Sequence, residues 1–137
     1  MFKNSKLVIS FISIFLFSGC SFFTSHGRAF NRAEKAEERG DYYRSVLECV
    51  ESLKLNRDYE KPLLLMDNVF PKAIMSYNQK LNRYLKKENK NWDMIIKFYQ
   101  EINYMIDSVE KLNILKQEIW FNSSDLRDYE LELKETK

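Results

Sequence analysis

Apolar residues recur along most of the chain at intervals of three and four, the spacing that places them on one side of an α-helix. The clearest example is the segment 42–55, in which Val46, Val50 and Leu53 share one face. The same periodicity predicts five helices in all. They cover residues 28–39, 42–55, 60–88 and 92–112, with the fifth in the tail, where the Asn-Ser-Ser segment at 122–124 is predicted to be both a break and the N-cap.

Few residues interrupt these segments, because the whole chain contains only three glycines and two prolines. An all-α fold is therefore favoured over a turn-rich β fold. Pro62 suits a first helical turn, whereas Pro71 lies inside a predicted helix and should kink or divide it. Gly40 follows the first predicted helix, where we expect a tight or left-handed turn.

We expect the aliphatic and aromatic stripes of these helices to form one core. Ala29, Ala33 and Ala36 give the first helix a face of small residues that lets another helix approach closely. Cys49 lies on the apolar stripe of 42–55, so it should be a buried, unreactive thiol. The other residues predicted to pack in the core are Val46, Val50, Leu53, Leu63, Phe70, Ile95, Ile102 and Ile106.

The first 19 residues have the order of a secretory signal. Two lysines precede an apolar stretch of 11 residues at 7–17, and the small residues Ser18 and Gly19 follow it. Basic, apolar and small regions in this order are typical of a signal peptide. A spanning helix needs about 20 apolar residues, so this stretch is too short to cross a bilayer.

Residues 16–20, Leu-Phe-Ser-Gly-Cys, resemble the lipobox of bacterial lipoproteins, although Phe17 replaces the Leu that is typical three places before the cysteine. The resemblance implies cleavage after Gly19 and attachment of diacylglycerol to Cys20, with further acylation, commonly by palmitate. The acyl chains would anchor the protein in membrane lipid. Ser21 is compatible, by analogy with that family, with the outer membrane. A plain signal peptide cut near Ser21 and an uncleaved anchor are the alternatives.

Removal of residues 1–19 changes the charge balance of the chain. The formal net charge of +2 includes Lys3 and Lys6, so the mature chain carries 20 basic and 20 acidic side chains. This balance does not favour nucleic acid or an anionic surface as a partner. We expect residues 20–27 to form a short lipidated tether and residues 28–137 to form one helical domain.

Residues 40–65 resemble the second half of a tetratricopeptide repeat and the entry to the next. The first helix lacks the Trp and the Leu-Gly of that family, and Arg57 replaces its closing Pro. A weaker copy of the pattern follows at 90–97. The resemblance implies two tetratricopeptide-like hairpins followed by a C-terminal helix, and a generic helical bundle is the alternative. The matching positions are Gly40, Asp41, Tyr42, Ser45, Ser52, Leu53 and Leu55.

The sequence shows none of the residue constellations that mark common catalytic sites. His26 is the only histidine and lies in the predicted tether, so no histidine base is expected in a site. The mature chain cannot supply the Cys and His ligands of a zinc site. It contains neither a Gly-rich phosphate loop nor a G-x-S-x-G motif. We therefore expect a protein that is not an enzyme and that uses no cofactor or metal.

Six aromatic residues exceed what a single small core readily accommodates. Aromatic side chains are enriched at protein interfaces, so our hypothesis is that some of the six line a groove between the two hairpins. The alternative is that they complete the core. The six residues are Tyr42, Tyr77, Tyr84, Trp92, Phe98 and Tyr104.

These observations together predict an envelope lipoprotein that acts as a non-catalytic scaffold or adaptor for a protein partner. Stacked helical hairpins present surfaces suited to peptides or helices. One alternative is a subunit of the outer-membrane protein assembly machinery. Another is a surface-exposed antigen or host-binding lipoprotein. An envelope enzyme accessory or lytic factor is disfavoured because the sequence offers no acid–base pair.

Overall fold

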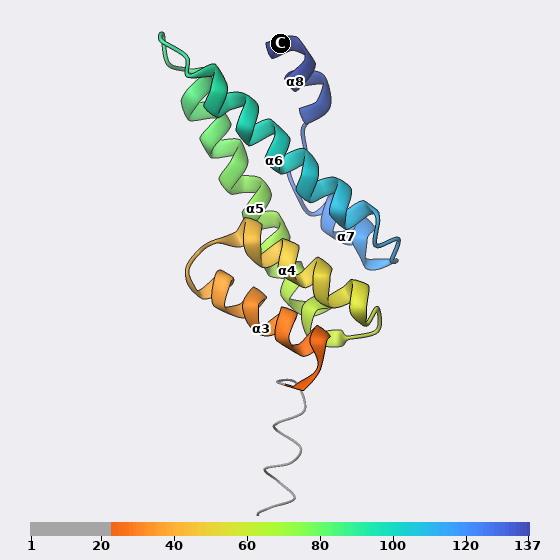
Figure 1. Ribbon diagram of the computed structural model, residues 1–137. Coiled ribbons are helices and arrows are strands. Elements are labelled where there is room, and N and C mark those ends of the chain that lie inside the picture. The colour runs from red at the N-terminus through yellow and green to blue at the C-terminus, as the bar shows by residue number, and fades with distance from the viewer. Residues whose placement is uncertain (1–22) are drawn as a thin grey trace, which may run out of the picture.

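A computed structural model describes residues 23–137, and every regular element in that part of the chain is an α-helix. The predicted all-α fold is thus confirmed for these residues. The predicted signal peptide, the cleavage position at Gly19 and the lipidation site at Cys20 lie outside them. The helices are α3 (Ser25–Glu38), α4 (Tyr42–Leu55), α5 (Glu60–Leu85), α6 (Trp92–Glu110), α7 (Lys116–Asn122) and α8 (Tyr129–Thr136) (Figure 1).

The first four helices form two successive hairpins. Helix α3 packs along α4, α4 packs on α5, and α5 pairs with α6. The hairpins also touch through α3 with α5 and through α4 with α6. Figure 1 shows α5 running from the α3–α4 hairpin to the far end of the molecule, where a loop turns the chain back into α6. This arrangement agrees with the predicted pair of helical hairpins.

Helix α3 begins three residues before the predicted start, so Ser25 to Gly27 belong to the domain and not to a tether. Thr24 is the N-cap, and its Oγ1 accepts a hydrogen bond from the Gly27 amide at 3.1 Å. The Ser52 hydroxyl donates to the His26 carbonyl at 2.7 Å. The His26 ring packs edge-to-face on Tyr59, with ring centroids 4.8 Å apart. These contacts tie the predicted end of the tether to α4 and to the turn before α5.

Small side chains allow α3 and α4 to approach closely. Ala29, Ala33 and Ala36 are fully buried, as their spacing predicts. The Ser45 hydroxyl donates to the Ala33 carbonyl at 2.9 Å, which satisfies a buried polar group between the two helices. Cys49 is also fully buried on this side of α4.

Gly40 ends α3 with the backbone geometry that its position predicts. Its φ of +73° lies in the left-handed region. The Gly40 amide donates to the Glu37 carbonyl at 2.8 Å, and the Asp41 amide donates to the Ala36 carbonyl at 2.9 Å. This pair of hydrogen bonds is a Schellman motif, which turns the chain from α3 into α4.

We expect Gly40→Val to lower the free energy of unfolding by about 1–2 kcal/mol, the cost of placing an L-residue in the left-handed region. An added Cβ would meet no atom within 4 Å, so backbone strain and not a clash causes the loss. Urea unfolding measures it. Gly40→Asn is the matched control, because asparagine tolerates this conformation and should cost less. Equal losses for the two variants would contradict the left-handed turn.

The core extends along α5 and receives side chains from each of the other helices. Phe70, Ile74 and Leu81 are fully buried on the inner side of α5. Pro71 lies inside α5, and the helix continues through it without dividing. Of the eight residues predicted to pack in the core, Leu63 and Ile106 are only partly buried, and the other six are buried.

The tail contains two short helices instead of the single one predicted. Ser123 and Ser124 donate their hydroxyls to the Trp120 carbonyl at 3.0 and 2.7 Å, so they end α7 and do not cap the next helix. Asp128 caps α8, with its Oδ1 accepting from the Leu131 amide at 3.0 Å. Trp120 is fully buried, and its Nε1 donates to Asp67 Oδ1 at 2.7 Å, which fixes α7 to α5.

Candidate protein-binding surface

A surface groove lies where the two hairpins meet, between α4 and α6. The α4 residues that line it are three and four positions apart in the sequence, so one face of α4 forms one side of the groove. Leu47 is half-buried and Val50 is buried, which gives the groove an apolar floor. Its volume is about 380 Å³. We call it the α4–α6 groove, and it is lined by Arg32, Leu47, Glu48, Val50, Glu51, Lys54, Tyr104 and Ser108.

Tyr104 is the aromatic residue of this groove. Its side chain is 59% exposed, so most of the ring is accessible to a partner. The backbone beneath it is held in α6, where the Ser108 hydroxyl donates to the Tyr104 carbonyl at 2.7 Å. Its exposed ring and hydroxyl can offer a partner both apolar contact and a hydrogen bond.

Charges of both signs border the groove. Arg32 Nε donates to Glu48 Oε2 at 2.9 Å, which joins α3 to α4 across the rim. Arg44 lies 3.8 Å from the other Glu48 oxygen. Glu51 and Lys54 are exposed on the next turns of α4. The rim therefore offers a partner both anionic and cationic contacts beside an apolar floor.

A separate cluster of buried and half-buried aromatic rings joins α4, α5 and α6. Ring centroids are 5.5 Å apart between Tyr43 and Tyr77, 6.2 Å between Tyr77 and Phe98, and 5.3 Å between Phe98 and Tyr84. The Tyr77 hydroxyl donates to Glu101 Oε2 at 2.8 Å. Burial raises the pKa of Tyr77, and the hydrogen bond to Glu101 and its negative charge raise it further. Tyr77 therefore stays protonated and donates to Glu101 at neutral pH.

The six aromatic residues selected from the sequence do not line one groove between the hairpins. Tyr77 and Phe98 are 3% and 7% exposed and pack in the core. Tyr42 and Tyr84 are half-buried, and Lys72 Nζ lies 5.3 Å from the centre of the Tyr42 ring. Trp92, at 46% exposed, and Tyr104 are the two that are open to solvent. Tyr104 alone lines the α4–α6 groove.

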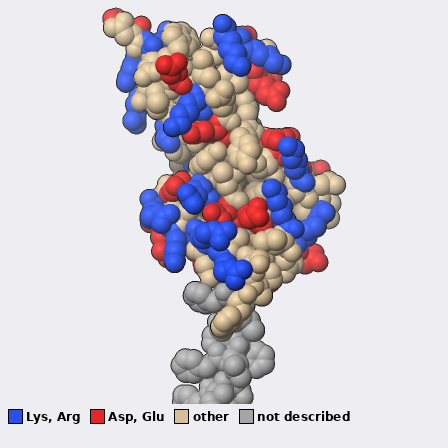
Figure 2. All heavy atoms as spheres, in the orientation of Figure 1, with Lys and Arg blue, Asp and Glu red and all other residues tan. Residues whose placement is uncertain are grey.

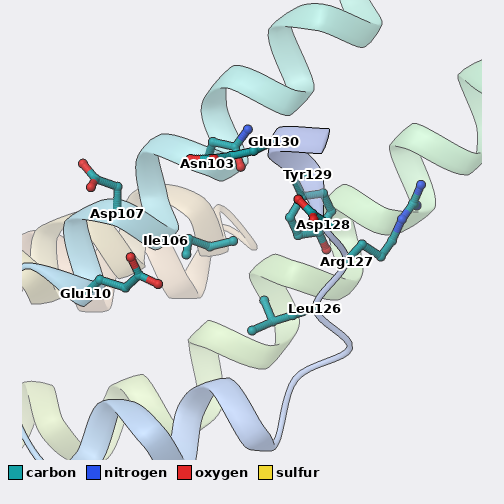
Figure 3. Close-up of a pocket in the computed structure, with 9 residues that line it drawn as sticks. All are labelled: Asn103, Ile106, Asp107, Glu110, Leu126, Arg127, Asp128, Tyr129 and Glu130. Atoms are coloured by element: carbon teal, nitrogen blue, oxygen red, sulfur yellow. The ribbon is translucent and has the colours of Figure 1, made fainter. Parts of the chain in front are cut away.

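A second pocket lies on the other side of α6, beneath the segment that leads into α8 (Figure 3). Its volume is about 350 Å³. Ile106 and Leu126 face each other across it, whereas the Asp107 and Arg127 side chains point away (Figure 3). Asp107 instead pairs with Lys111 at 2.7 Å. The carboxylates along its edge are Asp107, Glu110, Asp128 and Glu130.

Polar contacts fasten α8 beside this pocket. Arg127 donates from two nitrogens to the Glu132 carboxylate, one bond measuring 2.9 Å, and the Tyr99 hydroxyl donates to the same carboxylate at 2.6 Å. The Tyr129 hydroxyl donates to Asn78 Oδ1 at 2.6 Å. Burial raises the pKa of Glu132, but the hydrogen bonds from Arg127 and Tyr99 and the Arg127 charge outweigh it, so its pKa is lowered.

This lowered pKa predicts a loss of stability in acid. A carboxyl group whose pKa is lower in the folded state stabilises the fold above its unfolded pKa, about 4.3 for Glu. That stabilisation falls as the pH drops through the folded-state value. We expect thermal unfolding of the wild type to shift downward below about pH 4, and Glu132→Gln to remove part of this pH dependence. A parallel pH profile for the two proteins would contradict the role of Glu132.

The described residues offer little for covalent or metal chemistry. Burial raises the pKa of the Cys49 thiol far above neutral, and the charges of Glu48 and Glu34 add to the shift. Cys49 is therefore protonated and shielded. Between residues 23 and 137, no group of His, Cys, Asp and Glu side chains has a metal-binding arrangement.

Sequence reasoning missed Tyr43, which joins the aromatic cluster where its neighbour Tyr42 had been selected. The hydrogen bond by which Trp120 anchors α7 to Asp67 was also missed. No helix within the described part of the chain has the length and apolar character needed to cross a bilayer.

Comparison of the chain with known protein families, curated proteins and solved structures found no match.

Proposed function

We propose that this protein is an envelope lipoprotein, anchored through Cys20, that serves as a non-catalytic protein-interaction module. The observation that carries the proposed activity is Tyr104, an aromatic side chain 59% exposed at the edge of the α4–α6 groove. Aromatic anchors beside an apolar pocket are the residues that most often dominate protein-binding energy.

The shape and polarity of the groove favour a particular kind of partner. Leu47 and Val50 form its apolar floor, and Arg32, Glu51 and Lys54 border it. An amphipathic helix or extended segment could place apolar side chains on the floor and charged ones against the rim. The charges would favour correct orientation more than they add affinity.

The proposed location in the envelope, at the outer membrane, rests on residues 1–21. The basic, apolar and small regions of this segment indicate export, and its resemblance to a lipobox supports lipidation at Cys20. Lipidation would place the interaction module at a membrane surface, where its partner would also be found.

We expect Tyr104→Ala to weaken partner binding by about 2 kcal/mol or more, roughly thirtyfold, as for other exposed aromatic anchors. Its melting temperature should stay close to that of the wild type because the ring is largely outside the core. The measurement is a quantitative crosslinking yield in intact cells, from a photoreactive residue at Glu51 in the groove, with the crosslinked protein identified by mass. Leu115→Ala is the matched control, because Leu115 is 94% exposed and does not line the groove.

The crosslinked partner also discriminates among the possible roles. An outer-membrane β-barrel recovered through the groove would favour the assembly machinery, and a host protein would favour a surface-exposed role. An unchanged crosslinking yield for Tyr104→Ala would overturn the groove as the binding site. A large fall in melting temperature for that variant would show that Tyr104 belongs to the core.

A further inference from the structure

Cations are concentrated where α5 turns into α6, although the mature chain as a whole is balanced. Residues 80–93, which we call the basic tip, contain five Lys or Arg residues and two carboxylates, Glu88 and Asp93. Residues 28–41, at the other hairpin, contain four of each sign. In the described residues, none of the tip cations forms an ion pair. The five cations are Lys80, Arg83, Lys86, Lys87 and Lys90.

Three of the four lysines of the basic tip lie against aromatic rings instead of carboxylates. Lys87 Nζ is 4.5 Å from the centre of the Tyr84 ring, and Lys90 Nζ is 5.7 Å from that of Trp92. Lys80 Nζ lies 4.9 Å from the Tyr77 ring. Such contacts are weak at exposed sites and leave the positive charge in place. The tip therefore combines uncompensated charge with an exposed indole, since Trp92 is 46% exposed.

The tip also has a distinctive place in the fold. It is a convex hairpin end, and neither the α4–α6 groove nor the pocket beside α8 contains a tip residue. Figure 1 places it at the opposite end of the molecule from the start of α3. In the view of Figure 2, Lys and Arg side chains lie along one side of this end, and acidic side chains are seen at its apex and on its face. Helix α5, with 26 residues, gives a separation of roughly 39 Å between its two ends.

We propose that the basic tip binds the surface of a bilayer that contains anionic lipid. Clustered lysines are attracted by the negative surface potential of such a bilayer, and an exposed indole partitions into the headgroup region. A convex tip suits a flat, deformable surface better than it suits a peptide, which requires a groove. The proposal goes beyond the α4–α6 groove as a protein-binding site and does not depend on lipidation of Cys20.

The test uses the protein reconstituted into phosphatidylcholine vesicles. The acyl chains on Cys20 hold it there, or, in a chain that is neither cleaved nor lipidated, the apolar residues 7–17 do. Fluorescent, protein-free vesicles of phosphatidylcholine with phosphatidylglycerol are then added, and their docking is measured by co-sedimentation. We expect docking that weakens with salt, and little docking of vesicles made of phosphatidylcholine alone. Lys86→Glu, Lys87→Glu and Lys90→Glu together should weaken docking on the order of a hundredfold or more.

The matched control reverses three exposed cations outside the tip, Lys35→Glu, Arg39→Glu and Lys61→Glu, and should dock like the wild type. Equal flotation with the phosphatidylcholine vesicles and equal circular dichroism verify that all variants are inserted and folded. Fluorescence gives a second readout, because Trp92 should shift to shorter wavelength on docking while Trp120 is buried throughout. Trp92→Phe should remove that shift.

Four results would overturn the proposal. One is equal docking by the tip and control variants, and another is no docking by the wild type. The third is specific binding of polyglutamate by the tip without docking of anionic vesicles, which would identify an acidic peptide as its partner. Competition by inorganic phosphate at the ionic strength of a chloride control would show that the tip binds free phosphate and not a lipid surface.

Discussion

Replacement of Phe70 by alanine should lower the free energy of unfolding by about 3–5 kcal/mol, the usual cost of deleting a buried aromatic ring. Phe70 is fully buried on α5, and its ring packs edge-to-face on Phe121 of α7 with centroids 5.5 Å apart. The substitution removes this contact and leaves a cavity between the two helices. The loss is a large part of the roughly 5–15 kcal/mol that stabilises a typical domain.

Urea unfolding followed by circular dichroism measures this loss. Met75→Ala is the matched control, because Met75 lies on the same helix but is 54% exposed. That variant should change the free energy of unfolding by no more than about 0.5 kcal/mol. If the two variants unfold at the same urea concentration, the assignment of the inner and outer faces of α5 is wrong.

Cys20→Ser should abolish lipidation, the second large effect that we expect. Serine has no thiol to form the thioether, so neither the diacylglycerol nor the cleavage that depends on it should follow. Intact-mass analysis of the protein produced in a bacterial host should show acyl chains on the wild type and none on the variant. The wild type should also begin at Cys20, whereas the variant should retain residues 1–19 or be cut elsewhere.

The other cysteine provides the matched control for this experiment. Cys49 is buried against α3, so Cys49→Ala should leave the acyl mass unchanged. If the wild-type protein carries no acyl chains, the lipoprotein hypothesis is wrong, and residues 1–19 are either a plain signal peptide or an uncleaved anchor. The N-terminal residue of the isolated protein then distinguishes these two.

Helices with strong periodicity and clear end signals were predictable from the sequence. The prediction 42–55 equals α4, because the Asp41 side chain caps its start and Asn56 ends it. Helix α3 began early because the Thr24 cap lay within a segment interpreted as tether. Helix α7 was missed because its seven residues are too few to show a periodicity. The cap of α8 was misplaced because serines that can cap a helix can also end the previous one.

The candidate surface was less predictable, because it depends on which way neighbouring side chains point after packing. Tyr42 and Tyr43 are adjacent in the sequence, yet only Tyr43 joins the aromatic cluster with Tyr77. The periodicity identifies a helix but not which of its flanking residues meets another helix. The positive charge of the basic tip could have been predicted by counting basic and acidic residues in short segments of the sequence. The balanced net charge of the whole mature chain concealed it.

The stacking of α3 on α4 and of α4 on α5 has a bearing on how quickly the chain folds. Contacts between neighbouring helices close short loops, and domains dominated by such local contacts fold in microseconds to milliseconds. Contacts between residues far apart in the sequence include those of the tail, where Tyr129 reaches Asn78 and Trp120 reaches Asp67. We therefore expect the hairpins to form first and the tail to dock last, so that amide hydrogens of α8 exchange with solvent sooner than those of α5.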